Sequence, residues 1–199
     1  MKIFVITGPS GCGKSHLVNE LCQKGVYPLE VYTDRLRRSS ETTVTDRVYL
    51  TSTEFTNTLG EFLYWFEFQG NRYGYKLFDI ETQSAQNKSI CFNITPTDLI
   101  PLLKKLPHAI TIYLSVDINN FDMLFERIIK RELSPTDTKE NKDAKVAKIK
   151  NRLDYAKKEL ESFTKIQQEL LQNPLSKVFT IIDDTTLYNE VLPYIIKLM

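Results

Sequence analysis

The sequence predicts a single α/β domain built on a parallel sheet, and three features near its N-terminus carry that prediction. The residues Lys2–Thr7 form a continuous apolar run that ends at a glycine, as a buried parallel strand does. The residues Gly8–Ser15 then match the pattern GxxxxGK(S/T), which connects a strand to a helix. An amphipathic helix is expected to run from Lys14 until Gly25 stops it. Strand, glycine turn and helix in this order are typical of an α/β fold.

The rest of the chain continues this alternation, with one β-rich interruption. Further buried strands are expected at residues 90–95, 109–116 and 177–182. Helices are expected at residues 77–87, 97–106, 120–131, 146–172 and 185–198. Residues 32–75 are rich in Thr, Ser, Arg and aromatic residues in short alternating stretches, which suggests a small β-rich insertion. Residues 134–145 have no apolar face and are predicted to be a mobile loop between two helices.

The charge balance argues against nucleic acid and membrane partners. The 26 Lys and Arg residues nearly cancel the 25 Asp and Glu residues, so the whole chain offers no general attraction for a polyanion. The apolar stretch at the N-terminus is far shorter than the roughly 20 residues of a membrane span. We expect a cytoplasmic protein that binds neither nucleic acid nor a membrane.

The cysteines are scattered and do not form a pair with metal-ligand or disulfide spacing. Cys12, Cys22 and Cys91 have no CxxC arrangement and no flanking histidine cluster, which favours reduced thiols. Cys12 has two interpretations, a reactive thiol near a helix N-terminus or a small side chain that fits a tight loop, and we favour the second.

The glycine-rich turn has the chemistry of a phosphate-binding loop. Its glycines let successive backbone N–H groups converge on phosphate oxygens, and the helix N-terminus adds its dipole. In this pattern Lys14 reaches the β- and γ-phosphates, and Ser15 offers its hydroxyl to Mg²⁺. We therefore predict ATP and Mg²⁺ as cofactors. The residues expected to bind them are Gly8, Ser10, Gly11, Cys12, Gly13, Lys14 and Ser15, with Ser15 at the metal.

Several short motifs follow the loop in a fixed order. Residues 33–38 read TDRLRR, residues 46–50 read DRVYL, residues 60–62 read GEF and residues 70–74 read GNRYG. Later stretches are ERIIKR at 126–131, NRL at 151–153 and EL at 159–160. With GPSGCGKS, these motifs make the chain resemble the guanylate kinase family over most of its length. The resemblance implies a P-loop NTPase fold with a core of residues 1–32, 89–125 and 153–199, an acceptor-binding lobe of 33–88 and a helical lid of 126–152.

The resemblance also implies a reaction and its cations. The implied reaction is transfer of the ATP γ-phosphoryl group to a nucleoside monophosphate, with GMP or dGMP as the favoured acceptor. Arg35 and Arg38 match the arginines that grip the acceptor phosphate, and Tyr73 matches a tyrosine that donates to it. Phosphoryl transfer between two polyanions needs fixed cations, and arginine binds phosphate bidentately. The implied catalytic residues are Lys14, Arg35, Arg38, Arg127, Arg131 and Arg152.

Five positions depart from the family pattern. Val31, Tyr64 and Thr95 stand where the family carries the serine, glutamate and aspartate that read guanine. Arg47 stands where a phosphate-contacting tyrosine is usual, and Asn93 replaces an acid on the central strand. A carboxylate that accepts two hydrogen bonds from guanine discriminates strongly, and none of these residues preserves that chemistry. The expected acceptor-binding residues are Arg35, Arg38, Arg47, Tyr64, Tyr73, Asn93 and Thr95.

These departures leave two other interpretations open. One is an enzyme similar to ribose 1,5-bisphosphate phosphokinase, whose acceptor is a sugar phosphate without a base and whose extra phosphate Arg47 would meet. The other is a guanylate-kinase-like binding module without catalysis, although such modules generally lose parts of the phosphate loop that are intact here. The expected partner is thus a small phosphate acceptor, and we expect a monomer or a homodimer.

Overall fold

A parallel sheet forms the centre of the computed structural model, which describes residues 1–37, 47–117, 121–132, 139–183 and 185–199. Its strand order is β2-β7-β1-β8-β9, and the pairs within it are parallel. Its strands are β1 (Ile3–Thr7), β2 (Tyr27–Pro28), β7 (Ile90–Asn93), β8 (Ile110–Ser115) and β9 (Ser176–Thr180). The predicted α/β fold with a parallel sheet is confirmed.

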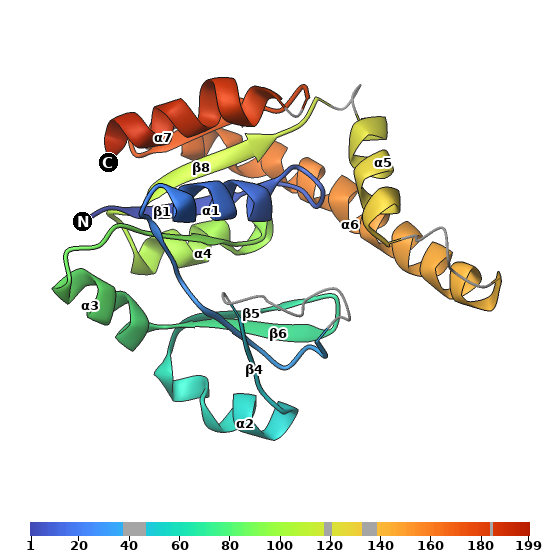
Figure 1. The fold of residues 1–199 in the computed structure, drawn as a ribbon, viewed down its shortest axis with the longest axis horizontal. Coiled ribbons are helices and arrows are strands. Elements are labelled where there is room, and N and C mark those ends of the chain that lie inside the picture. The colour runs from blue at the N-terminus through green and yellow to red at the C-terminus, as the bar shows by residue number, and fades with distance from the viewer. Residues whose placement is uncertain (38–46, 118–120, 133–138, 184) are drawn as a thin grey trace.

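Helices cover both faces of this sheet (Figure 1). Side chains of a strand alternate between faces, so Phe4 and Ile6 belong to one buried apolar cluster and Val5 belongs to the other. The first cluster includes α1 (Lys14–Gln23), the π-helical turn η3 (Leu187–Val191) and α7 (Leu192–Leu198). The second includes residues of α4 (Pro96–Lys105) and α6 (Lys139–Gln172). As predicted, the buried face of α1 consists of Leu17, Val18 and Leu21.

The β-rich insertion forms a second sheet that lies beside the core (Figure 1). Its order is β4-β3-β6-β5, with β3 and β4 parallel and the other pairs antiparallel. The strands are β3 (Val31–Thr33), β4 (Arg47–Tyr49), β5 (Phe62–Phe68) and β6 (Asn71–Lys76). Three short helices accompany them: α2 (Ser52–Asn57), η1 (Leu59–Glu61) and α3 (Leu77–Ala85). We call residues 31–85 the β-lobe.

One arginine holds the loop after β3 to the helix α2. The Nε of Arg72 donates to Asp34 at 2.7 Å, and its Nη2 donates to the carbonyl and hydroxyl of Ser52 at 2.8 and 2.7 Å. The guanidinium also lies over the Phe55 ring, 4.8 Å from its centroid. Both partners of the ion pair are largely shielded, so solvent screens this pair less than an exposed one. The pair therefore fixes the segment that leads to Arg35.

Side-chain hydrogen bonds tie the β-lobe to the core, among them those of Tyr75 and Lys105. The Tyr75 hydroxyl donates to the Asn93 carbonyl at 2.5 Å, and Lys105 Nζ donates to the Leu63 carbonyl at 2.8 Å. The Tyr75 ring also packs on Phe92, with centroids 4.5 Å apart. These contacts join β6 and β5 to the carboxyl end of β7 and to α4.

The two helices α5 (Phe121–Glu132) and α6 pack together and project beyond the sheet (Figure 1). The expected loop at 134–145 is wrong in part, because α6 is already helical at Lys139. The Lys, Glu and Ala residues of this segment favour helix. A helix whose C-terminal part is already packed also extends without a second nucleation step, which is the unfavourable step of helix formation. The lack of an apolar face was therefore not a valid reason to predict a loop from Lys139 onward. α6 runs from this projection back to the core, where it contacts β9 and α4.

No helix within the described ranges is long and apolar enough to cross a membrane. The division into core, lobe and lid segments at the stated boundaries stays a prediction.

We expect Leu99→Ala to lower the unfolding free energy by about 2–5 kcal/mol, because this side chain of α4 is fully buried and its removal leaves a cavity. The matched control is Leu171→Ala on α6, where the side chain is 65% exposed and the change should stay within about 0.5 kcal/mol. Urea unfolding followed by circular dichroism measures both. Equal losses for the two variants would contradict the assignment of the core.

Candidate functional site

A cavity of about 370 Å³ lies where the phosphate loop, the β-lobe and the two projecting helices meet. The core contributes the loop and the segment after β7, the lobe contributes β3 to β6, and α5 and α6 contribute the third side. Its lining includes Ser10, Gly11, Gly13, Lys14, Ser15, Val31, Arg35, Arg47, Phe66, Phe68, Tyr73, Tyr75, Asn93, Thr95, Arg127, Arg152 and Glu159.

Two glycines permit the loop to curl. Gly8 has a φ of 139°, and a Cβ there would lie 2.2 Å from the Leu114 carbonyl oxygen. Gly13 has a φ of 101° at the N-cap of α1, and a Cβ there would lie 2.8 Å from Leu187. Other residues would be strained in this left-handed region and would also collide with β8 or η3. The loop therefore turns tightly and points the N-terminus of α1 into the cavity.

Lys14 lies across the mouth of the loop. Its Nζ donates to the carbonyls of Gly8 at 2.5 Å and Pro9 at 2.8 Å. An ammonium in this position satisfies the loop carbonyls and is within a short side-chain rotation of any anion held by the loop amides. The predicted lysine and the loop therefore line the same cavity.

Cys12 is fully buried beneath the loop, and burial raises the pKa of its thiol despite the nearby Lys14 ammonium. This agrees with a small side chain that fits the turn, because a reactive cysteine needs exposure and a lowered pKa.

The projecting helices place two arginines and a carboxylate on the cavity wall. Arg127 of α5 donates from Nη1 to the Gly11 carbonyl at 3.3 Å, and Arg152 of α6 is only 4% exposed on the cavity wall. Glu159 is 5% exposed, and its Oε2 accepts the Ser10 backbone N–H at 2.9 Å. Burial raises the pKa of Glu159, while Lys14 and the Ser10 hydrogen bond act in the opposite direction.

The sequence did not single out Glu159 as a site residue. Its position seven residues after Arg152 on one helix was the available signal, because residues two turns apart share a face. Among the described residues that line the cavity, Glu159 is the carboxylate.

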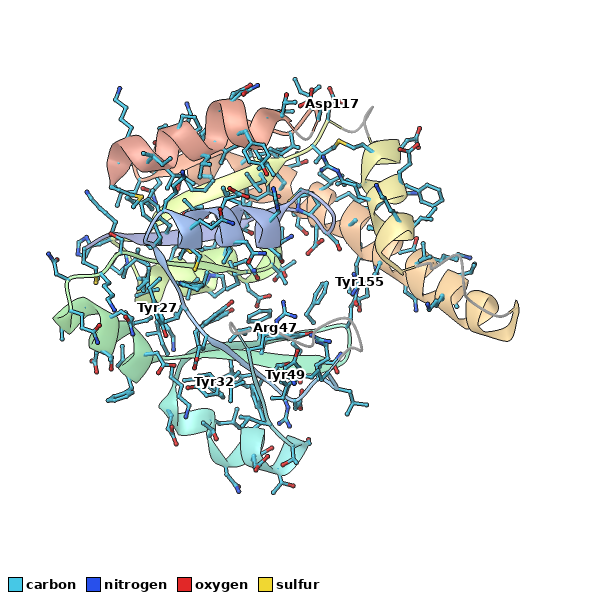
Figure 2. The ribbon with its side chains drawn as sticks, viewed as in Figure 1. Tyr27, Tyr32, Arg47, Tyr49, Asp117 and Tyr155 are labelled. Carbon is cyan, nitrogen blue, oxygen red and sulfur yellow. The ribbon has the colours of Figure 1, made fainter. Side chains whose placement is uncertain are left out.

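The lobe and the end of β7 together bring most of the expected acceptor-side residues to the cavity. Arg35, Arg47 and Tyr73 line it from the lobe, and Asn93 and Thr95 line it from the end of β7. Figure 2 shows Arg47 on the side of the lobe that is turned toward the core. Val31, the hydrophobic replacement on β3, is buried in the same wall.

Five expected residues are not placed in the cavity. Gly8 and Cys12 belong to the loop but do not line the cavity, and Cys12 is fully buried. Arg38 lies outside the described residues, and Arg131 lies on α5 with a side chain that is not described. Tyr64 is described but is not part of the cavity lining, because its hydroxyl donates to Asp98 Oδ1 at 2.9 Å.

Aromatic side chains that the sequence did not single out form one wall. Phe66, Phe68 and Tyr75 line the cavity beside Tyr73, and Phe66 is directly opposite Tyr73 in the β5–β6 register. The alternation in FLYWFEF was the available signal, because residues two apart on a strand face the same side. The Phe68 ring also meets Tyr155 of α6 edge to face, with centroids 5.6 Å apart. In Figure 2, Tyr155 lies on the side of α6 that is turned toward the lobe.

The described residues contain no cluster of three His, Cys, Asp or Glu side chains that could hold a metal by itself. Nucleotide-bound Mg²⁺ needs only one or two protein oxygens, because phosphates and waters supply its other ligands. Ser15 lines the cavity in the first turn of α1, next to the loop amides, and so fits such an ion.

Comparison with known proteins agrees with this geometry. The family model described as guanylate kinase matches residues 1–185. The chain belongs to the guanylate kinase family. It is 28% identical over 180 residues to a guanylate kinase of Synechocystis sp., covering 88% of each chain. It is 30% identical over 134 residues to a guanylate kinase of Thermotoga maritima, covering 65% of this chain and 64% of that relative.

The fold of a solved guanylate kinase from Anaplasma phagocytophilum also matches. The TM-score is 0.63 at 16% identity, over 99% of this chain and 83% of that one. The guanylate kinase fold and phosphotransferase class predicted from the motifs are therefore confirmed. Of the positions at which the resemblance implies departures, Val31, Arg47, Asn93 and Thr95 line the cavity, whereas Tyr64 does not.

We expect a brief treatment with iodoacetamide at neutral pH to modify Cys22 in the folded protein and to spare Cys12 and Cys91. Cys22 is exposed, whereas burial raises the pKa of Cys12 and raises the pKa of Cys91 to about 12, so neither presents a thiolate. Peptide mass spectrometry measures each site, and treatment in urea is the control in which all three react. Modification of Cys12 as fast as Cys22 in the folded protein would contradict this description of the loop.

Proposed function

We propose that the protein transfers the γ-phosphoryl group of ATP to a nucleoside monophosphate, with GMP or dGMP as the favoured acceptor. The observation that carries the proposal is the convergence of Lys14, Arg35, Arg47, Arg127 and Arg152 on one cavity that also holds the phosphate loop. Cations from three separate parts of the chain suit a reaction that must bring two polyanions together.

On the donor side, the loop amides and the N-terminus of α1 hold the triphosphate. Lys14 leaves the Gly8 and Pro9 carbonyls and turns to the β- and γ-phosphates, because an ionised phosphate is a better partner than two carbonyls. Ser15 would hold a Mg²⁺ ion that neutralises charge on the triphosphate.

On the acceptor side, Arg35 and Arg47 bind the monophosphate and Tyr73 donates its hydroxyl to it. The sequence adds Arg38 to this group. Phosphate oxygens are already nucleophilic, so no side chain has to remove a proton from the acceptor.

On the third side, Arg127 and Arg152 would stabilise the charge that spreads over the transferred group, and the sequence adds Arg131. Arg127 contacts the Gly11 carbonyl of the loop, so it is held close to where the γ-phosphate would lie. Closure of α5 and α6 over the substrates would exclude water and prevent hydrolysis of ATP.

The aromatic wall favours a nucleotide over a sugar phosphate as acceptor. Phe68 and Tyr73 are half-buried on the cavity wall and offer ring surface to a base, which a ribose bisphosphate lacks. A binding module without catalysis is disfavoured by the intact loop, in which Gly8, Gly13, Lys14 and Ser15 are all present. The cytoplasmic location and the choice between monomer and homodimer stay predictions.

A coupled assay with ATP and Mg²⁺ against GMP, dGMP, the other monophosphates and ribose 1,5-bisphosphate tests the acceptor class. Turnover of GMP supports the proposal. Turnover of ribose 1,5-bisphosphate alone would replace the acceptor, and ATP binding by calorimetry without any turnover would favour the binding module.

We expect Lys14→Ala to lower kcat by about 100-fold or more, since one charge that stabilises the transferred group is removed. The matched control is Lys24→Ala, an exposed lysine at the other end of α1, which should leave kcat and both KM values close to wild type. The coupled assay measures both variants at saturating ATP and GMP. Full activity of Lys14→Ala would overturn the assignment of the donor site.

A further inference from the structure

A buried carboxylate joins the helix α6 to the phosphate loop. Glu159 is 5% exposed, and its Oε2 accepts the backbone N–H of Ser10 at 2.9 Å. The two residues are 149 positions apart in the chain, so only the tertiary packing brings them together. The proposed reaction gives this carboxylate no task as a base, because phosphate oxygens are already nucleophilic.

The hydrogen bond between Glu159 and Ser10 is charge-assisted and shielded from water. Burial raises the pKa of Glu159, whereas the Lys14 ammonium and the Ser10 hydrogen bond oppose that rise. A backbone N–H binds a carboxylate more strongly than it binds a neutral acceptor. Removal of the carboxylate would leave the partly buried N–H of Ser10 without this acceptor, which is costly. The bond therefore constrains the shape of the loop.

The part of α6 around Glu159 is packed along one face. Arg152, Ala156 and Glu159 are at most 5% exposed, and their spacing of four and three residues places them on the same side of a helix. Arg152 also lines the cavity. The helix therefore presents the carboxylate from a fixed, buried surface.

The helix and the loop also rest on one strand of the core. One turn after Glu159, Phe163 stacks on Tyr113 of β8, with ring centroids 4.2 Å apart. The next residue of β8, Leu114, lies so close to Gly8 that a Cβ on this glycine would be 2.2 Å from its carbonyl oxygen. The strand β8 thus sets the distance that the Glu159 side chain spans.

The loop has other amides for a phosphate. Gly13 is the N-cap of α1, and it has no side chain to accept hydrogen bonds from the first N–H groups of the helix. Gly13, Lys14 and Ser15 line the cavity at this helix end, which is where an anion is favoured. A triphosphate can therefore bind the N-terminus of α1 while Glu159 keeps the N–H of Ser10.

We propose that Glu159 is a positioning residue, which holds Ser10 and with it the phosphate loop in the shape that binds the triphosphate. The inference rests on the proposed use of this loop to bind ATP. The carboxylate acts through the Ser10 amide rather than on the nucleotide itself. A loop that is already held in its binding shape loses less conformational freedom when ATP binds, so loss of Glu159 weakens ATP binding.

Calorimetric titration with ATP and Mg²⁺ tests the inference without any acceptor. Glu159→Ala removes the hydrogen-bond acceptor and should raise Kd for ATP by about tenfold, because the loop is no longer held in one shape. Glu159→Gln keeps an oxygen acceptor at the same reach and should raise Kd by about threefold or less. If Glu159→Ala does not fold, Glu159→Asp takes its place, because it keeps the charge but is one methylene too short to reach Ser10.

The matched control is Glu161→Ala, which removes the same charge from an exposed position on α6 and should leave Kd for ATP unchanged. The same Kd for Glu159→Ala and for this control would overturn the inference, although ATP binding by the wild type would still support the proposed donor site. Tighter ATP binding by Glu159→Ala would make the carboxylate a competitor of the phosphates and would also overturn it. Equal losses in Glu159→Ala and Glu159→Gln would assign the effect to charge and contradict the positioning role. A wild-type protein that does not bind ATP would refute the proposed function and the inference together.

Hydrogen exchange followed by mass spectrometry reads the loop in the absence of ATP. In Glu159→Ala, the peptide that contains Ser10 should exchange about tenfold faster than in the wild type, while peptides of α7 should exchange at the wild-type rate. Faster exchange in both regions would indicate a general loss of stability and contradict the local role.

The coupled assay separates the two substrates. Glu159→Ala should raise KM for ATP by about tenfold and change KM for GMP by less than about twofold, because Arg35 and Arg47 belong to the β-lobe. Equal increases in both KM values would contradict a role that is confined to the phosphate loop.

Discussion

The parallel pairing of β1 with β7 is the constraint on which the site depends. Ile6 is opposite Asn93, the Ile94 N–H donates to the Ile6 carbonyl at 3.0 Å, and the Thr7 hydroxyl donates to the Ile94 carbonyl at 2.9 Å. Because parallel strands bring their carboxyl ends to one edge, the phosphate loop and the segment that carries Thr95 emerge side by side. The loop and Thr95 therefore line one cavity.

The lobe and the projecting helices add arginines and a carboxylate to that edge of the core sheet. Several cations gather around the cavity, and their mutual repulsion is partly offset by Glu159, which also connects α6 to the loop through Ser10. A bound polyanion would offset the repulsion among these cations more completely than solvent does. The lobe is fixed to the core through Tyr75, Lys105 and the Tyr64–Asp98 pair, so the aromatic wall is held at a set distance from the loop.

Local patterns predicted the features that depend on neighbours in the chain. The strand Ile3–Thr7, the glycine loop and the buried face of α1 follow from apolar periodicity and from the conformations that only glycine adopts readily. The family motifs predicted the P-loop NTPase fold. The sequence did not predict the helical start of α6 at Lys139. A polar segment without an apolar face becomes helical when the helix that follows it is already anchored by packing.

The sequence by itself determined that the protein has a phosphate loop on a parallel sheet and that arginines follow it at the spacing of the guanylate kinase family. Only the tertiary structure decided which side chains face the cavity. Tyr64 and Phe66 are two residues apart on one face of β5, yet Phe66 lines the cavity and Tyr64 does not. The Tyr64 hydroxyl instead meets Asp98, which is 34 residues away in the chain and is brought beside it only by the packing of α4 on the lobe.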